Sequence, residues 1–388
     1  SSSSPLFGGT VTVTPTFSGG LGKVGTSGSG SSEVSASATS GSPLTSAALS
    51  TSTTFTLTVT NAAGTEATVA SAAAVPQTVA VGTPTTSNLN VTVAGGADNT
   101  SRTFSSTVTG AADNSVTWSV DAVAGGNATV GTISAGGVYS AGTALGAHTV
   151  KATSVADPAQ NASATVTVVA APTAAFTPSS YRTVGDTGVV ESGSVQSGVT
   201  YAWTLSGNTA GNNGAITSGA ATSSVTFDAG TPAGTFDLGL TVTNAAGTAD
   251  VANHTVTVVA APVATSLAST FATVLNGDTV TLTPTFSNGT GQIGTSGSGS
   301  SQVTGSATSG NGVLSPAITG STTFTLTVTN LAGATATSTA TVANGATTYA
   351  TSASSLFAER QRHSAVSLSD GTVLIVGGTN VGDSFGVD

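Results

Sequence analysis

The sequence contains no cysteine and no methionine. The lack of cysteine excludes disulfides, cysteine-ligated metal centres and thiol-based redox chemistry. A newly translated chain begins with methionine, so Ser1 is not the start of translation unless only the initiator was trimmed. The run from Ser1 to Ser4, followed by Pro5, does not resemble a signal peptide, and we expect that a leader or a longer segment was removed upstream.

Charged residues are scarce: they make up 6% of the chain, against about 25% in an average protein. Hydrophobic residues still make up 38%, so the composition is not the low-hydrophobicity, high-charge type of a disordered chain. With six Lys and Arg residues, no basic patch and a net charge of −10, the chain is not expected to bind nucleic acid. No apolar run approaches the ~20 residues of a membrane-spanning helix. The length of 388 residues suits three or four domains.

One stretch, residues 52–64, recurs almost unchanged at 321–333 and more weakly at 234–247. Its apolar residues, Phe55 among them, alternate with threonines, and a period of two with a polar face is typical of a half-buried strand. The Asn-x-Ala-Gly sequence that follows tolerates positive φ and therefore predicts a turn into another strand. We interpret the stretch as the penultimate strand and last hairpin of a β-sandwich, used at least three times.

Two parts of the chain are copies of each other. Phe17 matches Phe286 and Phe55 matches Phe324, both at an offset of 269 residues (286 − 17 and 324 − 55), with no gap between them. Such repeats indicate tandem domains rather than a solenoid. The joints are short Ala-Pro segments, so we expect closely coupled neighbours. The predicted units are residues 1–76, 77–171, 172–261 and 262–345, followed by an extension over 346–388.

The second unit carries a tryptophan strand and a tight hairpin. Val116–Val120 contains Trp118, a Gly-x-Tyr hairpin follows around Tyr139, and His148–Asp157 is another threonine-rich strand. These segments resemble a bacterial group-two immunoglobulin-like domain.

The third unit has its own tryptophan strand, Val199–Leu205 with Trp203, and a threonine-faced strand over Thr235–Asn244. It resembles the polycystic-kidney-disease (PKD) type of immunoglobulin-like repeat, and the first and fourth units resemble looser relatives of the same group. The resemblances imply an all-β fold: a string of four immunoglobulin-like β-sandwich domains with a C-terminal β-hairpin extension. They place both tryptophans in a core without a disulfide and imply little about function.

The extension has a different character. Arg360 and His363, the Asp370-Gly371 pair and the Gly377-Gly378 pair after an apolar run resemble the opening of a kelch or galactose-oxidase-like propeller blade. Asp-Gly between two apolar runs predicts a hairpin. A propeller needs at least four blades of four strands, so these residues alone cannot form one. The resemblance implies that the gene continues further, or once did.

No catalytic arrangement emerges from the histidines, because the three lie in different units. His148 replaces the phenylalanine of the threonine-faced strand and is predicted to be a packing or strand-edge residue. His254, in a final strand, is predicted to be structural. His363 matches a kelch position, where it would help to hold a blade together.

The carboxylates form no calcium-loop motif. Asp98, Asp113 and Asp121 are close in sequence; we interpret them as solvated loop residues, with a calcium ion at a domain end as the alternative. We therefore predict no catalytic residue, no cofactor and no metal site.

The ends of the chain carry the most specific hypothesis. The offset of 269 maps Ser1 onto position 270, so Val263–Ala268, the expected first strand of the fourth unit, has no counterpart in the first. A sandwich without that strand exposes a pairing edge and an apolar slot. We hypothesise that the apolar strand Thr372–Val376 of one copy fills this slot in the next. The predicted subunit-contact residues are Leu6, Phe7, Thr372, Val373, Leu374, Ile375 and Val376.

The sequence therefore predicts a bacterial, extracellular or cell-surface structural protein that is secreted, processed at its N-terminus and not an enzyme. The preferred function is a subunit of a surface fibre, a homopolymer joined head to tail by β-strand complementation. The alternatives are a passive stalk fragment of a larger adhesin or kelch-propeller protein, and the non-catalytic part of a secreted carbohydrate-active enzyme. A further alternative is that the hairpin packs on the fourth unit of its own chain. A cell-surface or carbohydrate ligand is left open.

Overall fold

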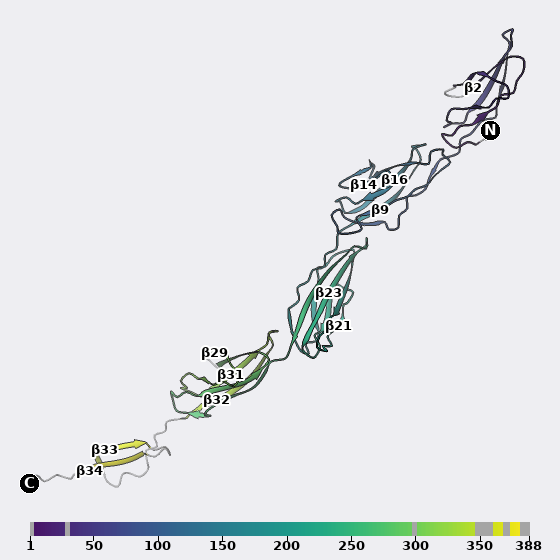
Figure 1. Cartoon of the computed structure of the whole chain (residues 1–388). Helices are drawn as coiled ribbons and strands as arrows, with labels where there is room; N and C mark the ends of the chain where they lie inside the picture. The colour runs from purple at the N-terminus through teal and green to yellow at the C-terminus, as the bar shows by residue number, and fades with distance from the viewer. Residues whose placement is uncertain (1–3, 28–31, 297–300, 346–359, 368–372, 381–388) are drawn as a thin grey trace, which may run out of the picture. The chain divides into compact units, whose positions relative to one another are not determined.

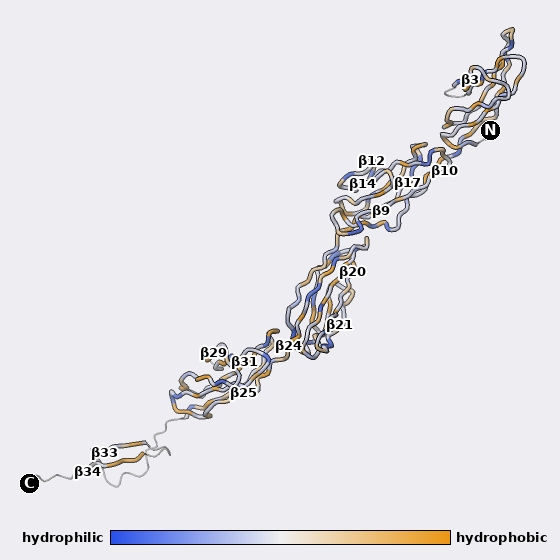
Figure 2. Tube along the Cα trace, viewed as in Figure 1, coloured by the Kyte–Doolittle hydropathy of each residue, from blue (hydrophilic) through white to orange (hydrophobic). Residues whose placement is uncertain are grey.

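The computed structural model describes residues 4–27, 32–296, 301–345, 360–367 and 373–380, and strands with their connecting turns account for all of this part (Figure 1). No helix in these ranges is long and apolar enough to cross a membrane. Apolar and polar residues alternate along the strands, as Figure 2 shows, because successive side chains of a strand point to opposite faces. The fold is a string of four immunoglobulin-like β-sandwiches with a C-terminal hairpin, which confirms the predicted fold class.

The first sandwich has a four-stranded sheet and a minimal second sheet. The strands in sheet order are β3 (Glu33–Ala38), β2 (Leu21–Ser27), β5 (Thr54–Thr60) and β6 (Glu66–Ala70), faced by β1 (Thr12–Val13) paired with β4 (Leu44–Thr45). Its buried hydrophobic residues are Val11, Val24, Ala38, Leu49, Phe55 and Ala74, of which Val11, Leu49, Phe55 and Ala74 pack together as one cluster.

The fourth sandwich repeats this plan in a more complete form. Its larger sheet is β26 (Thr273–Val274), β32 (Thr335–Asn344), β31 (Thr322–Thr329), β28 (Thr290–Ser296) and β29 (Gln302–Ala307). The smaller is β25 (Val263–Ser269), β27 (Thr281–Ser287) and β30 (Val313–Leu314). The core has ten buried residues: Leu267, Val274, Val280, Leu282, Ile293, Ile318, Phe324, Leu326, Val328 and Val342.

The second sandwich pairs a five-stranded sheet with a four-stranded one. The first is β12 (Val123–Ala124), β11 (Val116–Val120), β16 (Gly146–Ser154), β17 (Asn161–Val169) and β8 (Asn90–Thr92). The second is β13 (Gly126–Asn127), β14 (Gly131–Ile133), β15 (Val138–Ser140) and β9 (Ser101–Thr103), and β10 (Val108–Thr109) pairs separately with β7 (Ala80–Val81). The predicted hairpin is β14–β15, and Trp118 is buried as predicted.

The third sandwich contains the longest paired strands. One sheet is β18 (Tyr181–Thr183), β24 (Ala249–Val259), β23 (Gly234–Asn244) and β20 (Val199–Ser206); the other is β19 (Val189–Ser192), β22 (Ser224–Asp228) and β21 (Ala215–Ser218). Trp203 is buried as predicted. Its ring lies edge-on to Phe176 with centroids 4.8 Å apart, and its Nε1 donates to the carbonyl of Thr222.

The predicted Asn-x-Ala-Gly turns are present and the asparagine organises them. Asn61 Oδ1 accepts hydrogen bonds from the amides two and four residues later, at 2.9 and 3.0 Å. Asn330 Oδ1 does the same at 3.0 and 2.9 Å. Gly64 and Gly333 have φ of +81° and +83°, a conformation that glycine adopts without steric cost. The side-chain bond and the glycine together turn each penultimate strand into the last one.

The extension forms an antiparallel pair, β33 (Arg360–Ser367) and β34 (Val373–Asn380), with Ala365 opposite Ile375. The predicted Asp370-Gly371 turn lies outside the described residues. The pair forms a two-stranded sheet of its own. The apolar run lies in β34, over Val373–Val376, whereas β33 is mostly polar and has two apolar residues, Ala365 and Val366 (Figure 2).

Candidate functional site

A groove of about 230 Å³ opens on the first sandwich beside β1. Its lining is mainly apolar: Val13, Thr14, Pro15, Thr16, Val24, Phe55, Leu57, Val69, Ala70 and Ser71. The residues come from both sheets, so the groove leads from the surface into the space between the layers. Core residues such as Val24 and Phe55 therefore border the groove, and the core is incompletely covered there.

The fourth sandwich has a strand at the equivalent place. There β25 runs antiparallel to β27, with Leu267 opposite Pro284 and Ala268 opposite Thr283. Subtracting the offset of 269 maps Pro284 onto Pro15 and Thr283 onto Thr14, which line the groove. The groove is therefore the position of the strand that the first unit was predicted to lack, and no described residue occupies it.

The cores differ accordingly. Leu267 of β25 is buried in the fourth sandwich, where Leu326 and Val328 of β31 are fully buried. Their counterparts in β5, Leu57 and Val59, are only partly buried. The open groove thus leaves these apolar side chains with fewer neighbours on one side, which weakens their dispersion contacts and leaves apolar surface in water.

The groove also has a free β-edge. In the fourth sandwich, Thr283 and Thr285 pair with β25. The backbone amides and carbonyls of their counterparts, Thr14 and Thr16, make no hydrogen bond within the described part of the chain. Unpaired strand edges of this kind accept an added strand through main-chain hydrogen bonds.

The predicted contact residues lie at both ends. Thr372 lies outside the described residues. The other four residues of the apolar strand are exposed: Val373 by 58%, Leu374 by 49%, Ile375 by 36% and Val376 by 55%.

At the other end, Leu6 is 42% exposed. Phe7 is engaged within the chain: its amide donates to the Gly110 carbonyl at 2.8 Å, and its side chain packs against a cluster that contains Val79 and Ala111.

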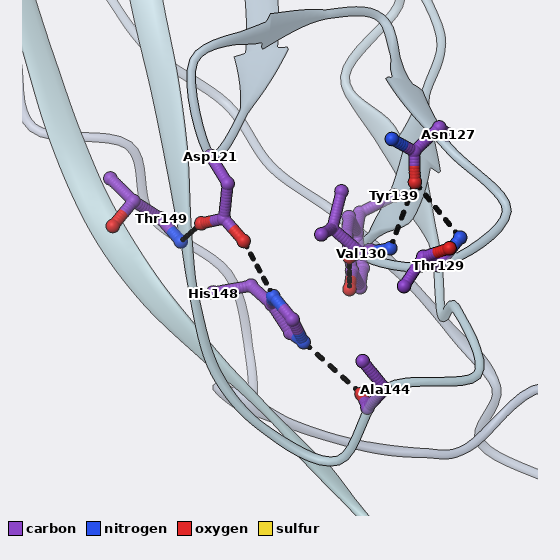
Figure 3. A network of polar contacts seen from close by, with 8 residues as sticks. All are labelled: Asp121, Asn127, Thr129, Val130, Tyr139, Ala144, His148 and Thr149. Carbon is purple, nitrogen blue, oxygen red and sulfur yellow. Dashed lines mark hydrogen bonds and ion pairs between the residues drawn. The ribbon is translucent and has the colours of Figure 1, made fainter.

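The most connected polar cluster lies in the second sandwich, around His148 (Figure 3). His148 Nδ1 lies 2.7 Å from Asp121 Oδ2, and Nε2 lies 3.1 Å from the Ala144 carbonyl oxygen. Both neighbours accept hydrogen bonds, so a protonated imidazole that donates from both nitrogens satisfies the site. The Thr149 amide donates to Asp121 Oδ1 at 2.7 Å and fixes the carboxylate.

The two pKa values move in opposite directions. Burial alone lowers the pKa of His148, but its hydrogen bonds to Asp121 and to the Ala144 carbonyl outweigh burial and raise that pKa. Burial alone raises the pKa of Asp121, and hydrogen bonds from His148 and Thr149 outweigh it and lower that pKa. The pair thus links the turn at Asp121 to β16.

Figure 3 also shows the neighbouring phenol. Tyr139 is fully buried, donates to the Val130 carbonyl at 2.7 Å, and burial raises its pKa to about 12. Asn127 Oδ1 accepts from the Thr129 and Val130 amides at 2.9 and 3.1 Å. Each of these groups is committed to holding backbone, which suits a structural role.

The three aspartates are used separately. Asp113 accepts from the Ser115 side chain and amide, which lowers its pKa. Asp98 contributes its backbone carbonyl, which accepts from Thr248 Oγ1 at 2.7 Å. Among the described residues there is no group of three His, Cys, Asp or Glu side chains that could hold a metal ion.

The other two histidines fall in strands. His254 of β24 lies edge-on to Phe176, with ring centroids 4.7 Å apart, in keeping with its predicted structural role. His363 lies in β33 opposite Gly377, and its side chain is outside the described set.

A buried polar cluster between the second and third sandwiches was not foreseen. Thr92 Oγ1 and Thr248 Oγ1 are 2.6 Å apart, and Asn244 Nδ2 donates to Thr92 Oγ1 at 3.2 Å and to the Ala170 carbonyl at 2.8 Å. Asn244 is the asparagine of the third Asn-x-Ala-Gly turn, so its side chain serves both the turn and the neighbouring sandwich. The sequence feature that could have indicated this cluster is the turn asparagine Asn244, in the sandwich that follows the joint at Ala170.

Compared with known proteins, the sequence matches no protein-family model and no curated protein. Its fold resembles solved tandem-immunoglobulin structures. These include invasin, a bacterial integrin-binding protein (15% identity, 88% of this chain and 77% of that one, TM-score 0.37). They also include a variant of titin domains I67–I69, with 16% identity over 68% of this chain and 99% of that one and a TM-score of 0.34. Sidekick-1 immunoglobulin domains 1–5 have 12% identity over 88% of this chain and 76% of that one, with a TM-score of 0.28. The identities and TM-scores are low, so the function proposed below rests on the contacts of this chain.

Proposed function

We propose that this chain is an extracellular or cell-surface structural protein whose copies join head to tail when a strand of one copy adds to the first sandwich of the next. The observation that carries the proposal is the groove beside β1, since the matching place in the fourth sandwich holds β25. The groove combines the two requirements of strand addition: a free backbone edge at Thr14 and Thr16 and an apolar slot.

The donor we propose is β34 of a second copy. Its four consecutive apolar residues are exposed on both faces of the hairpin, and a two-stranded hairpin is at best marginally stable alone in water. Val373 and Ile375 point to one face of β34, and Leu374 and Val376 to the other. The groove is lined by threonines and apolar side chains, so an uncharged strand matches it.

The contact would repeat without closing, because donor and acceptor are different surfaces at different ends of the chain. Such heterologous contacts generate filaments. Burial of about three apolar side chains of β34 contributes roughly 4–9 kcal/mol before the cost of association. Phe7 was predicted to contact the next copy, but it already packs within its own chain. We therefore replace it in the proposed contact with the residues that line the groove.

The test uses the full chain, examined by negative-stain microscopy and sedimentation over a range of concentrations. We expect concentration-dependent filaments. Ile375→Asp and Leu374→Asp place a charge on opposite faces of β34, and the face that enters the groove is the one whose variant stays monomeric. Val195→Asp is the matched control, because Val195 is an 85% exposed apolar residue of the third sandwich.

A second variant blocks the acceptor instead of the donor. A second copy of residues 262–269, which contain β25, is fused directly before Ser1. The offset of 269 places this copy in register with the first sandwich. The chain then carries its own first strand and should stay monomeric. Filaments from this variant, or from both aspartate variants, would end the proposal, and a wild-type chain that never associates would favour a passive stalk.

A further inference from the structure

The fourth sandwich has a hollow of about 340 Å³ on the outer face of its larger sheet. Its floor is Gly294 of β28, and its walls include Gln292, Gln302, Thr325 and Thr327. The strand register brings these residues together: Gly294 lies opposite both Thr325 and Gln302, and Gln292 lies opposite Thr327. The core residues Phe324 and Leu326 alternate with these threonines, so the threonines lie on the face opposite the core, and the buried Ile293 is the core residue that also borders the hollow.

Four polar side chains of this hollow have no hydrogen-bond partner in the part of the chain that the structure describes. The amides of Gln292 and Gln302 and the hydroxyls of Thr325 and Thr327 make no hydrogen bond within the described residues, although residues beside them do, such as Thr295 to Ser301. Each amide both donates and accepts, and so does each hydroxyl. A ligand with many hydroxyls offers matching donors and acceptors.

Charge selects the class of ligand further. Residues 262–345 contain one ionisable side chain that is charged at neutral pH, Asp278, and it is not part of the hollow. A charged ligand would lose hydration there without gaining a counter-charge. A neutral polyhydroxylated molecule has no such cost.

The first sandwich shows what the same positions look like when they are closed. Subtracting 269 from Gln292 and Gln302 gives Lys23 and Glu33, whose side chains form an ion pair at 2.8 Å. These two side chains bind each other, whereas the two glutamines remain available. Glycine at 305 supports the open arrangement, because a Cβ there would lie 2.6 Å from Gln302 Nε2.

We propose that this hollow of the fourth sandwich binds a neutral carbohydrate through Gln292, Gln302, Thr325 and Thr327. The volume falls in the range of small-molecule sites. Binding at a single site is weak. A filament or a tandem array presents many such sites along a polysaccharide, and this multivalency supports adhesion. The site itself needs no strand exchange, so it stands independently of the proposed assembly.

The experiment is saturation-transfer NMR on the full chain with soluble neutral hexasaccharides (cello-, xylo- and malto-series), and with a tri-galacturonate as the anionic comparison. We expect transfer to at least one neutral series and none to the galacturonate. The double variant Gln292→Lys/Gln302→Glu, which recreates the ion pair of the first sandwich, should raise the Kd at least about tenfold. Thr327→Val should raise it less.

The matched control is Lys23→Gln/Glu33→Gln in the first sandwich, which should leave the Kd unchanged. Hydrogen-exchange protection of β28 and β31 verifies that each variant keeps its fold. Transfer only to the anionic sugar, no transfer to any neutral series, or full binding by the folded Gln292→Lys/Gln302→Glu variant would each overturn the proposal.

Discussion

The first and fourth sandwiches have nearly the same sequence pattern but differ in completeness. Among the described residues, the fourth buries ten hydrophobic residues and the first six. The difference centres on one element, because β25 covers in the fourth the place that is an open groove in the first. A second difference lies on the outer face, where Lys23 and Glu33 stand in place of two glutamines. The same sandwich plan thus has a covered core in the fourth unit and an open groove in the first.

The largest expected effect tests the depth of the two cores. Phe324→Ala should destabilise the fourth sandwich by about 3–5 kcal/mol, since Phe324 is 1% exposed within a ten-residue core. Phe55→Ala should cost the first sandwich less, because its ring borders the groove and has fewer buried neighbours to lose. Hydrogen exchange in urea, read separately over 322–329 and 54–60, measures both. Equal losses would contradict the difference in core depth.

The second prediction tests a variant in which the first sandwich is given the strand that covers the core of the fourth. The chain with residues 262–269 fused before Ser1 should gain roughly 1.5–3 kcal/mol in its first sandwich, the value of burying one leucine. The gain should appear as slower exchange over β5. A fused segment with Leu267→Asp is the control and should give no gain, because a charge cannot be buried in the groove. An identical gain from both segments would show that the groove is not the seat of a strand.

The third prediction is that the stability of the second sandwich depends on pH in a way that the stability of the first and fourth sandwiches does not. The raised pKa of His148 makes its stabilising contribution complete below about pH 6.5 and lost as pH rises through the folded-state pKa. The lowered pKa of Asp121 makes its contribution present above about pH 3.9 and lost as pH falls through its own folded-state pKa. Stability of the second sandwich should therefore be highest between these limits.

His148→Phe should remove the upper limit of this window and cost about 1–3 kcal/mol near pH 5, since Asp121 loses a charged donor. Fluorescence of Trp118 and hydrogen exchange over β16 follow the second sandwich. The first and fourth should show no matching transition. A pH dependence of equal size in the variant would mean that another group is responsible.

The smallest effect concerns the outer faces of the two copies. Lys23→Gln/Glu33→Gln makes the first sandwich resemble the fourth and should leave its stability unchanged within error. The two side chains are 58% and 46% exposed, so solvent screens their attraction. Exchange over β2 and β3 at low and high salt measures this. A clear loss that salt abolishes would show that the ion pair contributes more than an exposed pair normally does.

The sequence predicted the repeated elements because their causes are local. Alternation of Phe55, Leu57 and Val59 with threonine determines a strand and the face it buries, and it did so in β5, β23 and β31 alike. Asn61 and Gly64 determine a turn through a side-chain bond and a positive φ. The offset of 269 also predicted that the place of β25 is uncovered in the first unit, and no described residue occupies it. The PKD-type, group-two and kelch resemblances and the boundaries of the units stay predictions.

Only the tertiary structure decided what depends on contacts between distant residues. The offset predicted a slot, but the lining and volume of the groove depend on how β1, β5 and β6 pack around it. His148 and Asp121 are 27 residues apart, and the pairing of the strands brings them to 2.7 Å. Periodicity specifies which face a residue occupies, whereas register and packing specify its neighbour, and chemistry at this protein's surface depends on the neighbour.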